Sequence, residues 1–136
     1  MKSCLGSWLI IILMVVFFGC DSGVSPEDLE KIDPKFTALQ SNIFDLSCST
    51  KSCHGSDGAG NLFLTKDKSY TAMVNIRSSI DSKYYIVKPG NADSSYLYLK
   101  LTNPPSGVLM PKGNPKLSDA KIAAVKEWIN NGALNN

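Results

Sequence analysis

Hydrophobic residues after position 33 recur with the period of a helix. They are Phe36, Leu39, Ile43 and Leu46, with Phe44 beside them. Residues three or four apart lie on one face of an α-helix, so the pattern predicts a helix with one buried face. Asp33 and Pro34 are typical of a helix cap and of a proline in the first turn. We expect this helix to run directly into Cys48.

A second helical pattern lies near the other end of the chain. Its hydrophobic residues are Ile122, Val125 and Ile129, widened by Trp128. Ser118 and Asp119 precede them as a cap and a first-turn acid, and Leu117 is placed to contact the helix across that cap. Gly132 supplies a stop signal. These features predict a helix that begins after Ser118 and ends before Gly132.

The middle of the chain contains only short hydrophobic runs. Ser69 could cap a short helix that reaches Ile76. Asp93 or Ser94 could cap a third helix over residues 97–101, although the alternating leucines there also fit a strand. The expected elements in this region are therefore brief.

Residues 103–115 form the largest interruption of the pattern. They contain four prolines and two glycines, so they cannot be regular structure. The chain is therefore expected to be mostly α, with Pro/Gly-rich loops.

The first twenty residues are typical of an export signal. A positively charged start is followed by an apolar stretch over residues 9–18, which ends at Gly19 and Cys20. This stretch is too short for a comfortable membrane-spanning helix, which needs about 20 apolar residues. The ending FFGC resembles a bacterial lipoprotein signal, in which the chain is cut before a cysteine that carries lipid. An uncleaved anchor is the alternative.

Three segments follow from this interpretation. We expect a signal peptide over residues 1–19, a lipidated Cys20 that opens a polar tether over residues 20–33, and a folded domain over residues 34–134. The lipid would anchor the domain to a membrane on the periplasmic or cell-surface side.

The export signal accounts for two of the four cysteines, because Cys4 leaves with the signal and Cys20 takes lipid. Cys48 and Cys53 remain, in the segment CSTKSCHG, and His54, the only histidine, follows at once. Two free thiols do not usually persist in an oxidising compartment. The residues leave three interpretations open: a c-type haem site with a longer loop, a small disulfide, or a metal site with Asp57 as a weak fourth ligand.

A haem site would also need a ligand on the opposite face of the iron, for which a methionine thioether is well suited. Met73 and Met110 are the methionines outside the signal. Met73 lies at helical spacing with Ile76 and is expected in the core. Met110 lies in the proline-rich loop, where a ligand held against a haem would be expected. A disulfide domain has no need of such a loop.

The sequence resembles the small class I cytochrome c domains, especially the single-haem type of bacterial exported proteins and lipoproteins. The resemblance covers about residues 36–133. It rests on four segments in the order expected of relatives: IFDLSCSTKSCHG (43–55), VKPGNADSSYLYLKL (87–101), LMPKGNPKLSD (109–119) and VKEWINNGA (125–133). It implies a helical domain wrapped around one haem c.

The resemblance also implies a role for each site residue. Cys48 and Cys53 would attach the haem covalently, His54 would be the proximal iron ligand and Met110 the distal ligand. Four residues separate the cysteines where two are usual, so residues 49–52 must bulge. The implied function is a single-haem carrier of one electron at a time between redox partner proteins. The alternative is a haem-free exported lipoprotein in which a Cys48–Cys53 disulfide serves a binding or structural module.

The charges and the remaining residues narrow the function further. Residues 21–45 contain 2 Lys and 6 acids, a net charge of −4, whereas residues 48–136 contain 11 Lys and Arg and 6 acids, a net charge of +5. A basic domain could be steered to an acidic redox partner, although a solvated surface of scattered lysines is equally expected. Nucleic acid is not an expected partner, because no basic cluster with interleaved aromatics is present. One histidine limits the chain to one such haem, and no acid–base pair or nucleophile constellation indicates an enzyme.

Overall fold

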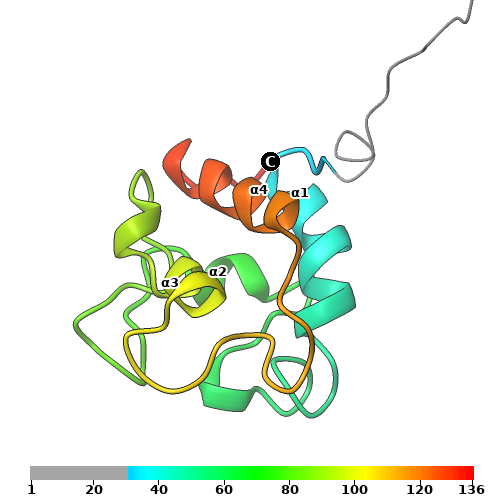
Figure 1. Ribbon diagram of the computed structural model, residues 1–136, viewed down its shortest axis with the longest axis vertical. Helices are drawn as coiled ribbons and strands as arrows, with labels where there is room; N and C mark the ends of the chain where they lie inside the picture. The colour runs from blue at the N-terminus through cyan, green and yellow to red at the C-terminus, as the bar shows by residue number, and fades with distance from the viewer. Residues whose placement is uncertain (1–30) are drawn as a thin grey trace, which may run out of the picture.

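The computed structural model describes residues 31–136 (Figure 1). Its helices are α1 Phe36–Leu39, the π-helix η2 Gln40–Cys48, the 3-10 helix η3 Ala59–Asn61, α2 Ser69–Met73, the 3-10 helix η4 Ala92–Ser94, α3 Tyr96–Thr102 and α4 Asp119–Asn130. Within this range there are isolated β-bridges but no strand, so the prediction of a mostly α domain is confirmed. The predicted signal peptide, Cys20 and residues 21–30 of the predicted tether lie outside the described residues. None of the helices in residues 31–136 has the length and apolar character needed to cross a bilayer.

The first predicted helix is present, but its second half is wound more widely than an α-helix. It comprises α1 and η2 and ends at Cys48 as predicted. The predicted start is wrong, because the helix begins at Phe36 with Lys35 at the N-cap position, so Asp33 is not the cap and Pro34 is not in the first turn. The Ser49 amide donates to the carbonyl of Phe44 at 2.8 Å, five residues back. Such i→i+5 bonds rotate the later side chains away from the α-helical stripe. The prediction that Leu46 continues the buried face is therefore wrong, because Leu46 is 69% exposed.

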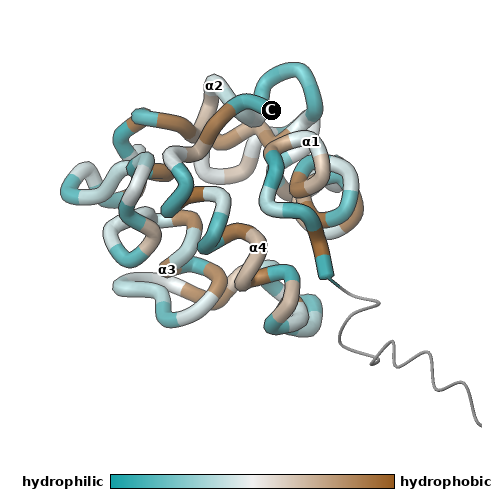
Figure 2. The backbone as a smooth tube through the Cα atoms, turned by 90° about the horizontal axis from the view of Figure 1, so that it is seen from above, coloured by the Kyte–Doolittle hydropathy of each residue, from teal (hydrophilic) through white to brown (hydrophobic). Residues whose placement is uncertain are grey.

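An aromatic cluster joins α1 to α2 and α4. The Phe36 ring lies 5.6 Å from that of Trp128 and 5.1 Å from that of Tyr70, and Tyr70 also donates a hydrogen bond to the carbonyl of Ala133. Hydrophobic residues recur along α1 and α4 in Figure 2, and their buried members belong to a single core. The first helix and the last helix of the domain therefore pack together.

The last helix begins and stops as predicted. The hydroxyl of Ser118 accepts a hydrogen bond from the Lys121 amide at 3.4 Å, and Leu117 and Ile122 are both buried beside this cap. Gly132 has a φ of +96°, a conformation that favours glycine, and the helix ends just before it.

The short middle elements differ in detail from the prediction. α2 begins at Ser69, which is itself helical and therefore not the cap, and it ends at Met73, so Ile76 lies outside it. Residues 97–101 are helical and not a strand. Neither Asp93 nor Ser94 caps α3, because both belong to η4.

Asn91 provides the cap in this region, since its side chain accepts a hydrogen bond from the Ser94 amide at 2.9 Å. Met73 is fully buried in the core, as its spacing predicted.

Gln40 is the largest of the polar side chains buried within the described residues. Gln40, only 3% exposed, accepts a hydrogen bond from the hydroxyl of buried Ser69 and donates to the carbonyl of Leu64 at 3.0 Å. It also donates to the carboxylate of Asp45 at 2.6 Å. The amide therefore connects η2 with α2 and with the loop between them.

Replacing Ser69 tests how much this amide contributes to stability. Ser69→Ala removes the hydroxyl donor and leaves the Gln40 oxygen buried without it, so the free energy of unfolding should fall by about 1–3 kcal/mol. Urea denaturation of the full-length chain, followed by circular dichroism, measures this change. Ser41→Ala is the matched control, because Ser41 is an exposed serine of the same helix, and it should stay within about 0.5 kcal/mol. An equal decrease in the free energy of unfolding in both variants would contradict the stabilising role of the Gln40 amide.

Candidate functional site

The four residues between Cys48 and Cys53 form a compact turn. The His54 amide donates to the carbonyl of Cys48 at 3.1 Å, and the Cys53 amide donates to that of Thr50 at 3.0 Å. The Gly55 amide reaches the same Thr50 carbonyl at 3.1 Å. The turn therefore accommodates the four residues 49–52 and brings His54 back beside Cys48, the last residue of η2. Cys48, Cys53 and His54 lie on one hydrogen-bonded loop, which we call the cysteine loop and define as residues 48–55.

The turn leaves no room for a side chain at Gly55. A Cβ built at this position would overlap the carbonyl oxygen of Ser49 and would lie 2.6 Å from that of Thr50. Both neighbours are backbone atoms, so neither can move without opening the turn. Glycine directly after His54 is therefore a steric requirement of the cysteine loop.

His54 is held on both sides by its backbone. Its amide bonds to Cys48, as above, and its carbonyl accepts a hydrogen bond from the Leu64 amide at 2.7 Å. The Leu64 carbonyl in turn accepts from buried Gln40. The cysteine loop is thereby tied to the core through a continuous chain of hydrogen bonds.

The imidazole itself carries an unsatisfied atom. His54 Nδ1 is buried and is the one buried side-chain nitrogen or oxygen in residues 31–136 without a hydrogen-bond partner. Leaving such an atom unpaired costs about 1–3 kcal/mol, so native structures rarely keep one without a reason. A water molecule or a bound group could supply the missing partner.

Both thiols of the cysteine loop are free and half-buried. Burial raises the pKa of the Cys48 thiol to about 11, and the neighbouring Cys53 adds to this rise. At neutral pH Cys48 is therefore a protonated, poorly nucleophilic thiol. Cys48 and Cys53 are not joined by a disulfide bond in this structure.

Met110 approaches the core from a different part of the chain. It is half-buried, and both Met110 and Cys48 pack against the hydrophobic core. Its amide donates to the carbonyl of Lys100 in α3 at 2.8 Å. No hydrogen bond among the described residues joins Met110 to the cysteine loop. The structure thus brings Cys48, Cys53 and His54 together on one loop, and it packs Met110 and Cys48 against the same core.

The side chains of the cysteine loop do not make a metal cluster of the ordinary kind. Within residues 31–136, no three His, Cys, Asp or Glu side chains converge as ligands, so nothing supports a metal site that includes Asp57. Instead, the possible donors are two free thiols, one imidazole and one thioether from a different segment of the chain. Such a set suits covalent attachment through sulfur together with axial ligation from two different segments.

Sequence reasoning missed three residues that shape the site. Gly55, Gln40 and Lys100 hold the cysteine loop or the Met110 backbone, yet none of them carries the expected chemistry. Gly55 had a usable signal, because glycine often marks a position where the backbone is approached too closely for a side chain. Gln40 and Lys100 had none, since each was indistinguishable from a solvated polar residue on a helix.

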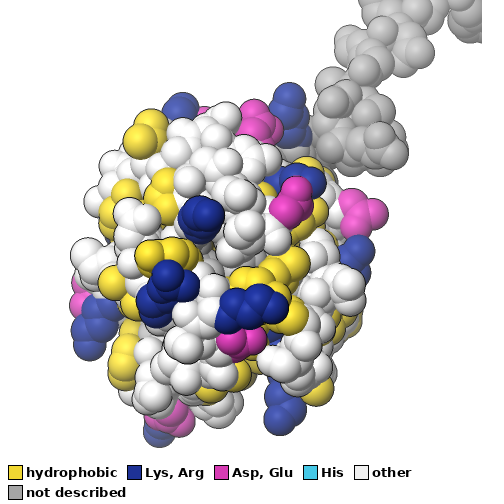
Figure 3. Space-filling view, turned by 90° about the vertical axis from the view of Figure 1, so that its left-hand side faces the viewer, with side chains coloured by type: hydrophobic (Ala, Val, Ile, Leu, Met, Phe, Trp, Pro, Cys, Tyr) yellow, Lys and Arg dark blue, Asp and Glu magenta, His cyan; other side chains and the backbone are white. Residues whose placement is uncertain are grey.

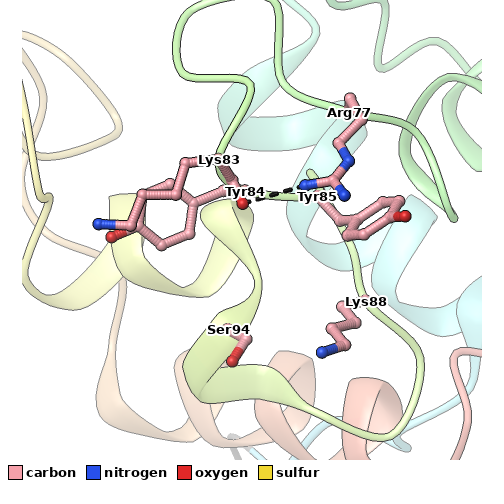
Figure 4. A pocket seen from close by; sticks show the side chains of 6 residues that line it. All are labelled: Arg77, Lys83, Tyr84, Tyr85, Lys88 and Ser94. Carbon is pink, nitrogen blue, oxygen red and sulfur yellow. Dashed lines mark hydrogen bonds between the residues drawn. The ribbon is translucent and has the colours of Figure 1, made fainter.

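A shallow cavity of about 300 Å³ lies away from all the predicted site residues (Figure 4). It is lined by Arg77, Lys83, Tyr84, Tyr85, Lys88 and Ser94. The Arg77 guanidinium lies 4.0 Å from the centre of the Tyr85 ring and donates to the carbonyls of Ser82 and Lys83, both at 3.1 Å. It therefore stabilises the turn that contains these two carbonyls. The space-filling view in Figure 3 shows basic side chains dispersed among apolar ones on one face of the domain, without forming a single cluster.

The chain was also compared with known proteins. Protein-family models, curated protein sequences and solved structures all failed to give a match.

Proposed function

We propose that this chain is a single-haem c-type cytochrome that carries one electron at a time between redox partners. The observation that carries the proposal is the cysteine loop, in which two free thiols and an imidazole with an unsatisfied buried nitrogen lie on one tight turn. This turn supports a haem site despite the four-residue spacing, because the extra residues are absorbed by backbone hydrogen bonds. The finer assignment of the helical domain to the cytochrome c-like folds belongs to the same proposal.

Each residue has a defined part in the proposed site. Cys48 and Cys53 would hold the haem through thioether bonds, and His54 and Met110 would fill the two axial positions. Bound haem would supply an iron that alternates between the ferric and ferrous states. The two backbone bonds of His54 hold the residue in place, which would limit reorganisation between those states. With both axial positions taken by protein, the chain would act as a carrier and not as an enzyme.

The proposed location of the carrier rests on Cys20, and its proposed type of partner rests on the basic side chains. Lipid on Cys20 would anchor it to a membrane on the periplasmic or cell-surface side. Among residues 31–136, ion pairs engage only Lys35, Lys116 and Lys126. Most of the basic side chains therefore remain free to attract an acidic redox partner, with a salt-dependent association rate. Nucleic acid is not part of the proposal.

The proposal predicts covalent haem. The full-length chain, produced in a host able to attach c-type haem, should give the reduced alkaline-pyridine band of a c-type cytochrome. Haem should follow the polypeptide on a denaturing gel. A band displaced toward the single-thioether type would mean that only one cysteine is attached. Absence of haem beside a positive control from the same host would refute the proposal and favour the haem-free disulfide lipoprotein.

Met110 can be tested separately from attachment. Met110→Ala should keep covalent haem but lose the ferric methionine–iron absorption band, and the reduction potential should fall because the thioether ligand raises it. Optical spectra and a redox titration measure the two changes. Met73→Leu is the matched control, since Met73 is fully buried in the core and should keep both properties. A Met73 variant that alone lost the band would reassign the distal ligand.

Gly55 tests whether the turn matters for attachment. Gly55→Ala places a Cβ against two backbone carbonyls, so the fraction of chains that carry haem on both cysteines should drop several-fold. Covalent haem per polypeptide, measured by mass spectrometry, gives the fraction. Gly60→Ala is the control, because Gly60 has a φ of +66° but no atom within 4 Å of a Cβ. Similar haem content in the two variants would show that the turn can open freely.

A further inference from the structure

The side chain and the backbone of Lys100 both bind the Pro/Gly-rich loop over residues 103–115. Its ammonium donates to the carbonyl of Ser106 at 3.0 Å, and its backbone carbonyl accepts the amide of Met110 at 2.8 Å. One residue of α3 therefore fixes two points of the loop that are four residues apart. Figure 1 shows this loop as the long yellow-to-orange segment between α3 and α4.

Tyr96 makes a third connection to the same loop. Its hydroxyl lies 3.2 Å from that of Ser106, at hydrogen-bonding distance. Tyr96 is 7% exposed, its ring stacks on that of Tyr84 with 5.6 Å between the ring centres, and the Lys100 ammonium lies 5.8 Å from the centre of the Tyr96 ring. Ser106 is therefore held by two side chains from successive turns of α3.

The helix α3, which carries Tyr96 and Lys100, is itself firmly attached to the rest of the domain. The Tyr96 amide donates to the carbonyl of Tyr85 at 2.9 Å, and the Leu97 amide donates to that of Ile86 at the same distance. Leu101, on the next turn, is buried in the core. α3 is therefore a fixed attachment point for the loop. Residues 105–109 of the loop are themselves exposed.

We propose that Lys100 and Tyr96 are positioning residues that clamp the loop at Ser106 and so hold the Met110 backbone in place. In the haem-bound protein this clamp sets how firmly the thioether stays on the iron. The inference rests on the proposed function for its redox consequence. The clamp itself rests on the hydrogen bonds above and can be tested without it.

Two conservative variants remove the clamp without emptying the core. Lys100→Met keeps the aliphatic stem but loses the ammonium, and Tyr96→Phe keeps the stacked ring but loses the hydroxyl. Hydrogen exchange of the Met110 amide, measured on the full-length chain as the host exports it, should accelerate about fivefold in each variant and further in the double variant. In haem-bound protein the methionine–iron band should also disappear at a lower temperature than in the parent chain.

Lys88→Met is the matched control. It removes the same charge from an exposed lysine whose ammonium makes no hydrogen bond within the described residues, and it should leave both readouts unchanged. Unchanged Met110 exchange in Lys100→Met and Tyr96→Phe would overturn the clamp, whether or not haem is present. Faster exchange with an unaltered methionine–iron band would overturn the claim that the clamp stabilises ligation. A parent chain without haem would refute the proposed function, and the exchange measurement would still decide the clamp.

Discussion

The side-chain amide of Gln40 connects segments that are distant in sequence and that must be in register for the site to form. It accepts from Ser69 of α2 and donates to the Leu64 carbonyl at 3.0 Å, while the Leu64 amide donates to His54 at 2.7 Å. Apolar contacts are non-directional and tolerate small slips of one segment along another. A buried amide does not, because losing a partner inside the core is costly. Gln40 therefore fixes where the cysteine loop lies, although it contributes no chemistry.

The fold was predictable where one period held along a whole helix. Ser118, the apolar stripe of α4 and Gly132 act within a few residues of one another, and the structure has each as expected. The first helix departs from the prediction because its later backbone bonds span five residues, so Leu46 turns outward. A change of winding depends on tertiary packing, and no local sequence signal marks it. Asp93 and Ser94 were wrongly expected to cap α3 for a different reason, since the Asn91 side chain caps η4 and both residues belong to that short helix.

The residues proposed for the site could be chosen from the sequence, but the geometry of the cysteine loop could not. Cys48, Cys53 and His54 stand out in the sequence because of their types and spacing. How four intervening residues are accommodated depends on a carbonyl, that of Thr50, which accepts two amides, and on the absence of a side chain at Gly55. Backbone hydrogen bonds of this kind cannot be predicted from the types of residue in the segment. Met110 was identified through the prolines around it, whereas its attachment to α3 through Lys100 became visible only in three dimensions.

The buried indole of Trp128 has a consequence for how the domain can be observed. It is 1% exposed, donates its N–H to the carbonyl of Leu134 at 2.8 Å and lies against Phe36. The other tryptophan of the sequence, Trp8, belongs to the predicted signal peptide. In a chain cleaved as proposed, tryptophan fluorescence would therefore come from a single position, where α1 and α4 meet. A porphyrin within the same small domain would accept that excitation energy, so one emission signal would report both the packing of the helices and the presence of the pigment.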